Sequence, residues 1–280
     1  MGLRINTNVP SLIAQRNLRS TRGSLDRTLE RLSSGYRINH AGDDAAGLAI
    51  SESLRAQLRG LSQAERNSQD GISVVQVAEG ALAEVSNILI RMRELGVQAA
   101  SDTIGPTERK FLDTEFQQLL EEIDRISNST EYNGVSLLNG TGSAFEIQIG
   151  TGNNPIIDRV KLFDSSATDI NVISLGINLA SVNDKVSAQN SLSAIDHSIS
   201  MVTKIRAEFG AMQNRLQSVI NNIAINKENI AAANSRIRDA DLAEEATELT
   251  KNQILMQSGV AVLSQANATA KTALGLLNQT

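Results

Sequence analysis

The chain of 280 residues contains no cysteine, no tryptophan and only two histidines. The absence of cysteine excludes disulfide bonds and thiolate chemistry. The histidines, His40 and His197, lie far apart and fit no metal-ligand spacing, so we interpret each as structural or exposed. No glycine-rich segment is followed by the Lys-Ser/Thr pair of a phosphate-binding loop. We therefore expect no enzyme activity, no metal and no cofactor.

Aromatic side chains are also scarce, and their positions are uneven. The two terminal segments contain no phenylalanine, so they must pack through leucine, isoleucine, valine and alanine. A well-packed core is therefore expected in the middle of the chain, where all five phenylalanines lie: Phe111, Phe116, Phe145, Phe163 and Phe209.

Charge and hydropathy exclude further classes of protein. The net charge is −5, and no basic stripe with interleaved aromatics indicates nucleic-acid binding. No stretch approaches the roughly 18 to 20 apolar residues of a membrane span, and the N-terminus has no apolar run of signal-peptide length. We expect no membrane insertion. If the protein leaves the cell, it uses a route that reads no cleaved apolar signal.

Proline occurs only at positions 10, 106 and 155, which leaves long segments free to be helical. The first segment ends at the Ser33-Ser34-Gly35 cluster. Asp43 or Asp44 can cap a helix that begins at about Ala45, and this pair is interpreted as a cap rather than a catalytic carboxylate pair. The helical spacing of the first segment rests on four leucines: Leu18, Leu25, Leu29 and Leu32.

The middle of the chain changes from helical to alternating periodicity. Apolar residues recur at helical spacing over 74–99 and 112–126. Between 145 and 149 they alternate with polar residues, and a Gly-Asn-Asn-Pro turn follows at 152–155, so a β-hairpin region is predicted within about 135–180. Helical spacing returns from about Ser187. Glycine is absent from 211 to 258, which predicts one long, uninterrupted helix there.

The last segment carries a heptad seam in which spacings of 4 and 3 alternate from Leu242 to Leu277, the pattern of a supercoiled helix pair. Gln253 and Asn267 interrupt the seam and are expected to set its register. Together with the four N-terminal leucines, the predicted self-assembly seam contains Leu242, Leu249, Met256, Val260, Leu263, Leu274 and Leu277.

The two ends carry opposite charge. Residues 1–44 contain seven arginines against four acids, and residues 238–280 contain three basic residues against five acids. This attraction can orient the ends, but exposed pairs contribute only up to about 1 kcal/mol each, so apolar burial must hold them.

The predicted fold is mainly α. Residues 1–44 with 238–280 are predicted to form a terminal coiled-coil domain of long antiparallel helices, and residues 45–237 a central helical domain with the small hairpin region. An ordinary intramolecular bundle is the alternative for the ends. One pair of such small-residue helices, however, buries too little surface to offset its ordering entropy. We therefore expect the ends to order when many copies pack around a common axis.

Several motifs together resemble the bacterial flagellin family, over essentially the whole chain. The N-terminal ones are Arg31-Leu-Ser-Ser-Gly-Tyr-Arg-Ile-Asn39, Asp43-Asp-Ala-Ala-Gly-Leu-Ala-Ile-Ser51 and Arg91-Met-Arg-Glu-Leu-Gly-Val-Gln98. Later ones are Glu122-Ile-Asp-Arg125 with Tyr132-Asn-Gly-Val135, Arg236-Ile-Arg-Asp-Ala-Asp241, Val262-Leu-Ser-Gln-Ala-Asn267 and Leu274-Gly-Leu-Leu277. His40-Ala-Gly42 departs from the usual Ser-Ala-Lys, and a polar Asn278-Gln-Thr280 tail replaces a common basic end.

The resemblance implies a structural subunit that self-assembles into the extracellular filament used for swimming. It implies terminal coiled coils in an inner tube, central helices in an outer tube, and secretion in unfolded form by the flagellar type III apparatus. The implied partners are further copies of the chain, an export chaperone, and the cap and junction proteins. Only a short stretch, about 135–180 with the hairpin included, fills the gap between the central helices, which implies a short form without large outer domains.

The resemblance also implies two groups of contact residues. Arg91, Leu95 and Glu115 match the positions by which flagellins meet the vertebrate toll-like flagellin receptor. Leu274, Leu276 and Leu277 match the region bound by the export chaperone and by an intracellular sensor.

Two alternatives remain. A hook–filament junction protein shares the terminal design, although the mid-chain motifs favour a filament subunit. An adhesin or host-binding module would need an exposed inserted domain, which the short gap does not supply.

Overall fold

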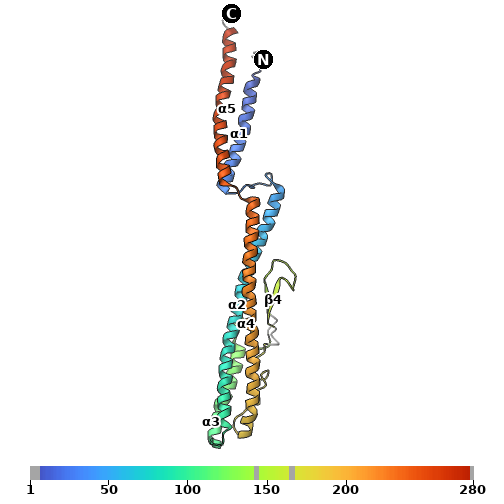
Figure 1. The fold of residues 1–280 in the computed structure, drawn as a ribbon, viewed down its shortest axis with the longest axis vertical. Coiled ribbons are helices and arrows are strands. Elements are labelled where there is room, and N and C mark those ends of the chain that lie inside the picture. The colour runs from blue at the N-terminus through green and yellow to red at the C-terminus, as the bar shows by residue number, and fades with distance from the viewer. Residues whose placement is uncertain (1–6, 142–144, 164–167, 278–280) are drawn as a thin grey trace. The chain divides into compact units, whose positions relative to one another are not determined.

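The computed structural model describes residues 7–141, 145–163 and 168–277; the side chains of residues 163 and 270–277 lie outside this description. The described chain is mainly α, as predicted, with five helices and four short strands (Figure 1). The helices are α1 (Val9–Ser34), α2 (Ala45–Ala99), α3 (Pro106–Ser129), α4 (Lys185–Arg238) and α5 (Leu242–Leu277). The strands are β1 (Glu131–Tyr132), β2 (Val135–Ser136), β3 (Phe145–Gln148) and β4 (Arg159–Phe163).

The chain divides into two compact units, and α2 and α4 each contribute to both. Unit 1 contains residues 1–56 and 229–280, and unit 2 contains residues 57–228. The predicted division into 1–44 with 238–280 and 45–237 stays a prediction, because it concerns separate roles in an assembly.

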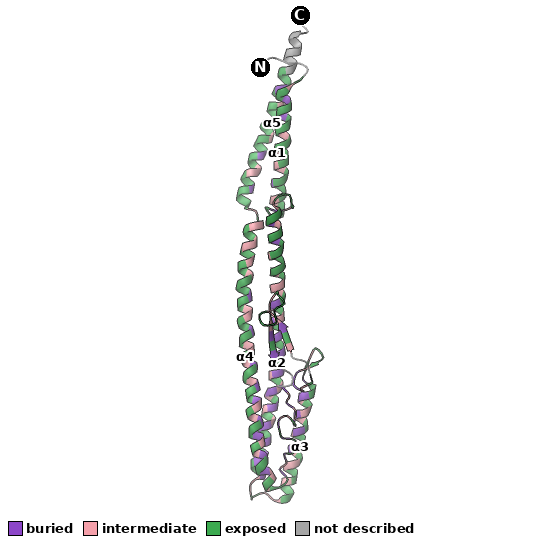
Figure 2. Ribbon diagram, turned by 90° about the vertical axis from the view of Figure 1, so that its right-hand side faces the viewer, coloured by how far each residue is buried: buried purple, intermediate pink, exposed green. Residues whose placement is uncertain are grey.

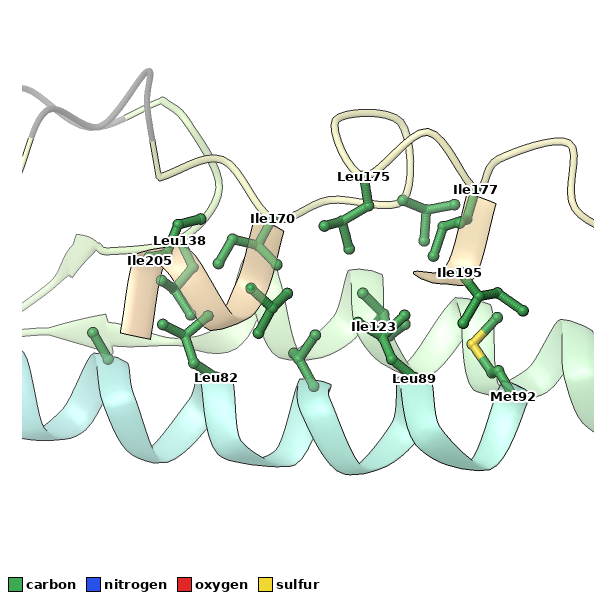
Figure 3. Close-up of a cluster of buried hydrophobic side chains, with 14 of the residues drawn as sticks. Leu82, Leu89, Met92, Ile123, Leu138, Ile170, Leu175, Ile177, Ile195 and Ile205 are labelled. Atoms are coloured by element: carbon green, nitrogen blue, oxygen red, sulfur yellow. The ribbon is translucent and has the colours of Figure 1, made fainter. Parts of the chain in front are cut away.

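The apolar core lies in unit 2. Leu82 of α2 lies near Ile205 of α4, and Leu89 and Met92 of α2 lie near Ile123 of α3 and Ile195 of α4 (Figure 3). The irregular segment between β4 and α4 covers this core with Ile170, Leu175 and Ile177, which are all at most 1% exposed. Two of the phenylalanines, Phe116 and Phe209, are buried in the same core, whereas Phe111 is 72% exposed.

Two antiparallel hairpins lie between α3 and the irregular segment. In the first, Asn133 and Gly134 have φ angles of 51° and 77°, which suits the two-residue turn between β1 and β2. In the second, β3 pairs with β4, with Ile147 opposite Val160. The predicted hairpin is confirmed. The pairing of β1 with β2 was not predicted, because strands of two residues carry no readable alternation.

The prediction of one uninterrupted helix over residues 211–258 was wrong. Helix α4 ends at Arg238 and α5 begins at Leu242. At this break Tyr36 forms an antiparallel bridge with Asp239, and the Asp241 carboxylate accepts a hydrogen bond of 2.8 Å from the Ala243 N–H, as an N-cap does. Two further backbone bonds tie the segments: Arg37 donates to the Arg238 carbonyl (2.7 Å) and Ala240 to the Gly35 carbonyl (2.9 Å).

Candidate assembly surfaces

Helices α1 and α5 pair antiparallel within unit 1 (Figure 1). Three contacts fix their direction. The Ser11 hydroxyl donates to Asn267 Oδ1 at 3.0 Å, Leu18 lies against Gly259, and Arg31 pairs with Glu245 at 3.1 Å. The residue numbers fall along one helix as they rise along the other, so the two ends of the chain run side by side.

The seam of this pair has heptad spacing on both helices, and small or polar residues alternate with leucine or methionine. On α1 the buried and half-buried positions at this spacing are Ser11, Ala14, Leu18, Thr21, Leu25, Thr28 and Leu32. On α5 they are Glu245, Leu249, Asn252, Met256, Gly259, Leu263 and Ala266. Ser24, Arg31 and Glu248 are half-buried beside the seam. Alternating spacings of 3 and 4 keep each set on one side of its helix.

The predicted seam residues divide into two groups. Six of them are half-buried on the α1–α5 seam: Leu18, Leu25, Leu32, Leu249, Met256 and Leu263. Three others are exposed: Leu29 (47%), Leu242 (57%) and Val260 (55%). Leu274 and Leu277 belong to α5, as does Leu276, but their side chains lie outside the described residues. A role of these residues in assembly stays a prediction.

Helix α5 has two overlapping seams. The predicted seam and the observed seam share residues 249, 256 and 263. At the positions between these, the predicted seam runs through residues 246, 253 and 260, whereas the observed seam runs through 245, 252 and 259. The observed seam was missed because Glu245, Asn252 and Gly259 are not apolar. Gly259 lies there because a Cβ atom would come within 2.8 Å of Leu18.

Asn8 joins the start of α1 to α5, and sequence reasoning missed it. Its Oδ1 accepts from the Ser11 N–H at 3.1 Å, and its Nδ2 donates to the Ala266 carbonyl at 2.9 Å. The local signal was an asparagine two residues before Pro10, which is typical of a helix start.

Among the described residues, one ion pair joins α1 to α5, and it is formed by Arg31 and Glu245. Glu245 is buried, with 8% of its surface exposed. This pair agrees with the opposite charges predicted for the two ends. Glu245 lies in the seam with its side chain 11% exposed, so losing Arg31 would leave a poorly solvated charge there.

Most residues of α1 and α5 are exposed outside the seam (Figure 2), and several of them are large and apolar. On α5, Val260 lies to one side of the seam, Leu255 and Val262 to the other, and Ile254 opposite, at 100° per residue. Each is 47–59% exposed. α1 adds Val9, Leu12 and Ile13. Helix α5 thus has apolar surface on sides that α1 does not cover.

The break between α4 and α5 is held by charged groups as well as by backbone bonds. Arg238 lies over the Tyr36 ring, 4.7 Å from its centre, and pairs with Glu52 at 2.6 Å. The hydrogen bond from Arg238, reinforced by Arg55, holds the pKa of Glu52 below its usual value.

In the polar turn before α2, Asp44 takes the predicted capping role, whereas Asp43 binds the turn itself. Asp44 Oδ1 accepts from the Gly47 N–H at 2.8 Å. Asp43 accepts from the backbone N–H groups of His40 and Asn39, and these bonds hold the pKa of its carboxyl below the usual value.

The predicted receptor residues lie in unit 2, and only two of them share an exposed surface. Arg91 pairs with Glu115 at 2.9 Å and with Glu94 at 3.0 Å, and these hydrogen bonds raise its pKa. Leu95 is completely buried in the core, so it does not lie on the exposed face of Arg91.

Within the described residues, no group of three or more His, Cys, Asp or Glu side chains could hold a metal ion. One helix, α2, is long and apolar enough to cross a membrane by length and composition alone. Its apolar residues from Val74 to Ala99 supply much of the unit 2 core, which is the expected place for them in a packed helical protein.

Comparison with known proteins decides the family. Residues 5–143 match the family model of the bacterial flagellin N-terminal helical region, and residues 192–277 match that of the C-terminal helical region. A flagellin of Halalkalibacterium halodurans is 46% identical over 273 residues, covering 98% of this chain and 99% of the relative. The chain belongs to the bacterial flagellin family.

Other flagellins and filament proteins are similar over nearly their whole length. The flagellin of Bacillus subtilis is 40% identical (98% of this chain, 100% of the relative), and a flagellar filament 33 kDa core protein of Treponema phagedenis is 41% identical (98% and 99%). The crystal structure of Bacillus cereus flagellin is 36% identical, with a TM-score of 0.50, and covers 60% of this chain and 94% of that one. The full-length matches to flagellins of this size agree with a short form without large outer domains.

Proposed function

We propose that this flagellin-family chain is the structural subunit of a flagellar filament and serves as part of the propeller in bacterial swimming. One observation carries the proposal: α5 exposes apolar side chains on sides that α1 does not cover. Burying such a side chain completely contributes about 1.5–3 kcal/mol. Further copies of the chain would supply that burial.

Each part of the chain has a role in this proposal. Residues 1–44 with 238–280 form the inner, coiled-coil layer of the filament, and residues 45–237 form the outer layer. The filament lies outside the cell, and the subunit reaches it by export in unfolded form. Because the ends bury little surface between themselves, they order fully only in the assembly.

A hook–filament junction protein is the second candidate. A candidate flagellar hook-associated protein of Vibrio parahaemolyticus shares the fold (18% identity, TM-score 0.57, 70% of this chain and all of that one). Similarity to flagellins at 46% identity over nearly the whole length favours the filament subunit.

The test removes residues 1–40 and 240–280 and compares the product with the intact chain by sedimentation and electron microscopy. The intact chain forms filaments, and the shortened chain stays soluble and helical without forming them. Filaments that persist without both ends would refute the proposal. The intact chain carrying only Leu255→Ser and Val260→Ser serves as a milder variant that keeps both ends; it is expected to assemble only at higher concentration.

Further partners are proposed from the family. The export chaperone binds the end of α5 through Leu274, Leu276 and Leu277, and cap and junction proteins contact the terminal helices. Replacing the three leucines by serine is expected to abolish chaperone binding in isothermal calorimetry. The same change at Leu242, Leu255 and Val262 is the matched control and should leave chaperone binding intact.

The toll-like flagellin receptor is a further proposed partner. Arg91 and Glu115 would meet it directly, while Leu95 supports them from within the core. Arg91→Ala with Glu115→Ala should weaken receptor signalling at least tenfold in a reporter assay. Arg93 and Asp196 form a comparable exposed pair at 2.7 Å, so their double alanine variant is the control. Equal loss in both variants would contradict a specific contact.

A further inference from the structure

A polar pocket of about 390 Å³ lies in unit 1, beside the α1–α5 seam. Helix α1, the turn before α2, and α5 all contribute to its lining. The side chains that matter for its chemistry are Arg27, Thr28, Arg31, Asp43, Glu248 and Asn252.

Asn252 contributes a hydrogen-bond donor without a partner to the pocket. It is 4% exposed, and its Nδ2 is buried without a hydrogen-bond acceptor among the described residues. Leaving a buried amide donor unpaired destabilises a structure, so asparagine at a seam position of an apolar helix pair requires a partner. The Thr28 hydroxyl donates to the Ser24 carbonyl at 3.1 Å and could still accept a hydrogen bond, but it does not accept one from Asn252 Nδ2.

The charges of the lining indicate what that partner is. Two arginines face two carboxylates, so the pocket does not select a free ion of one sign. Arg31 is engaged by Glu245, Glu248 by Lys251, and Asp43 by backbone N–H groups. Arg27 is exposed and donates a hydrogen bond of 3.4 Å to Ser24 of its own helix. The buried group of the lining that has no partner is therefore the Asn252 amide donor, and an oxygen acceptor satisfies it.

The surface beside the pocket indicates where such an oxygen comes from. Leu255 follows Asn252 by three residues and Val262 follows Leu255 by seven, so both flank Asn252 on one side of the seam, about 60° and about 80° around α5 from it. They are 47% and 59% exposed. A helix laid along these two side chains would bring its polar groups over the opening of the pocket.

We propose that the pocket receives an oxygen acceptor, from an amide or a carboxylate, of a second copy of the chain, and that Asn252 thereby sets the register between copies. This inference rests on the proposed function as a filament subunit. A buried polar residue at one seam position specifies register because every other alignment leaves it unpaired.

The first test uses the full chain with Asn252→Leu. This variant removes the unpaired donor, so the monomer keeps or gains thermal stability. Assembly loses the hydrogen bond between Asn252 and the second copy, so the critical concentration for filament formation rises about tenfold. Thr250→Leu adds the same side chain on the opposite face of α5 and is the matched control, with a change below about twofold.

The outcomes separate the two proposals. If the wild-type chain forms no filaments, the proposed function itself fails. If the wild-type chain assembles and Asn252→Leu assembles at the same concentration, or Thr250→Leu is impaired equally, the register role of Asn252 is overturned.

A second measurement does not depend on the variant folding. Filaments are grown from an equal mixture of uniformly ¹⁵N-labelled and uniformly ¹³C-labelled wild-type chains and studied by solid-state NMR. A cross-peak between Asn252 Nδ2 and a carbonyl or carboxylate carbon then joins two copies and supports the proposal. Its absence, while other cross-peaks between copies are seen, overturns it.

Discussion

Leu18 occupies the space that Gly259 leaves open on the opposite helix. A Cβ atom at position 259 would lie 2.8 Å from Leu18 Cδ2 and 3.1 Å from Leu18 Cγ. The α1–α5 pair therefore approaches closely at its middle, and the side chains of larger residues flank this contact. Close approach at a glycine lets two helices with little apolar surface still gain dispersion energy.

Gly259→Val is expected to destabilise the α1–α5 pair by about 1–3 kcal/mol, because the added methyl groups displace Leu18. Hydrogen exchange of the α1 amides in the monomer measures this as faster exchange. Gly23 on α1 has nothing within 4 Å of an added Cβ, so Gly23→Val is the control and should exchange like the wild type. Equal effects of both changes would show that helix propensity, not packing, is responsible.

Glu52 makes the contact at the helix break sensitive to acid. Its pKa is lowered chiefly by the hydrogen bond from Arg238, so this contact stabilises the fold above the usual glutamate pKa and is lost as the pH falls through the lowered value. NMR titration of Glu52 should give a midpoint below 4.5, the usual value. The midpoint should rise toward that value in Arg238→Gln, and Arg55→Gln should move it less. An unchanged midpoint in Arg238→Gln would contradict this assignment.

At the residue scale, sequence reasoning found the large side chains and missed the small ones. Leu18 and Leu249 were predicted on a seam because their apolar size is readable. Ser11, Asn252 and Gly259 were not predicted there. Whether a small or polar residue fits a seam depends on the residue opposite it, and the pattern of a single helix does not contain that information. Leu95 is a different case. The motif resemblance grouped it with Arg91 as a receptor contact, but Leu95 is buried in the core whereas Arg91 is exposed.

Among the elements, the break between α4 and α5 has a specific cause. Asp239-Ala240-Asp241 contains neither glycine nor proline, so local propensity alone does not end the helix strongly. The bridge to Tyr36 and the Asp241 cap make the break, and the bridge comes from a segment some 200 residues earlier in the chain. The start of α2 could be predicted because its cap, Asp44, is local.

Asp241→Ala is expected to destabilise the first turn of α5 by about 1 kcal/mol, because the Ala243 N–H loses its acceptor. Amide exchange at Ala243 and Glu244 should quicken about fivefold. Asp241→Asn keeps a good capping oxygen and should restore slow exchange. If the asparagine variant exchanges as fast as the alanine variant, the carboxylate charge rather than the cap holds this turn.

For the molecule as a whole, the two units use different means of stabilisation. Unit 2 has a contiguous apolar core that joins α2, α3, α4 and the irregular segment after β4. Unit 1 has one helix pair with a mixed seam. Composition predicted this contrast, because the phenylalanines are confined to the middle of the chain. It could not predict that the irregular segment, which has little periodicity, would cover the core with Ile170 and Leu175.

Leu89→Ala tests the core of unit 2. Leu89 is fully buried, so the change should lower the free energy of unfolding by about 2–5 kcal/mol. Val97 on the same helix is 51% exposed, and Val97→Ala should cost less than about 1 kcal/mol. Urea unfolding followed by circular dichroism measures both. Similar losses in the two variants would mean that this core is loosely packed.

The antiparallel pairing of α1 with α5 has a consequence for how the chain can change in length. Positions 11, 18 and 31 contact positions 267, 259 and 245, so each step forward along α1 is matched by a step back along α5. A residue inserted in the middle of α1 would turn every later side chain by about 100° and move it away from its counterpart. Only an insertion of seven residues, matched by seven in α5, would restore the spacing on both helices. The two ends of the gene, far apart in the sequence, can therefore gain or lose length only together.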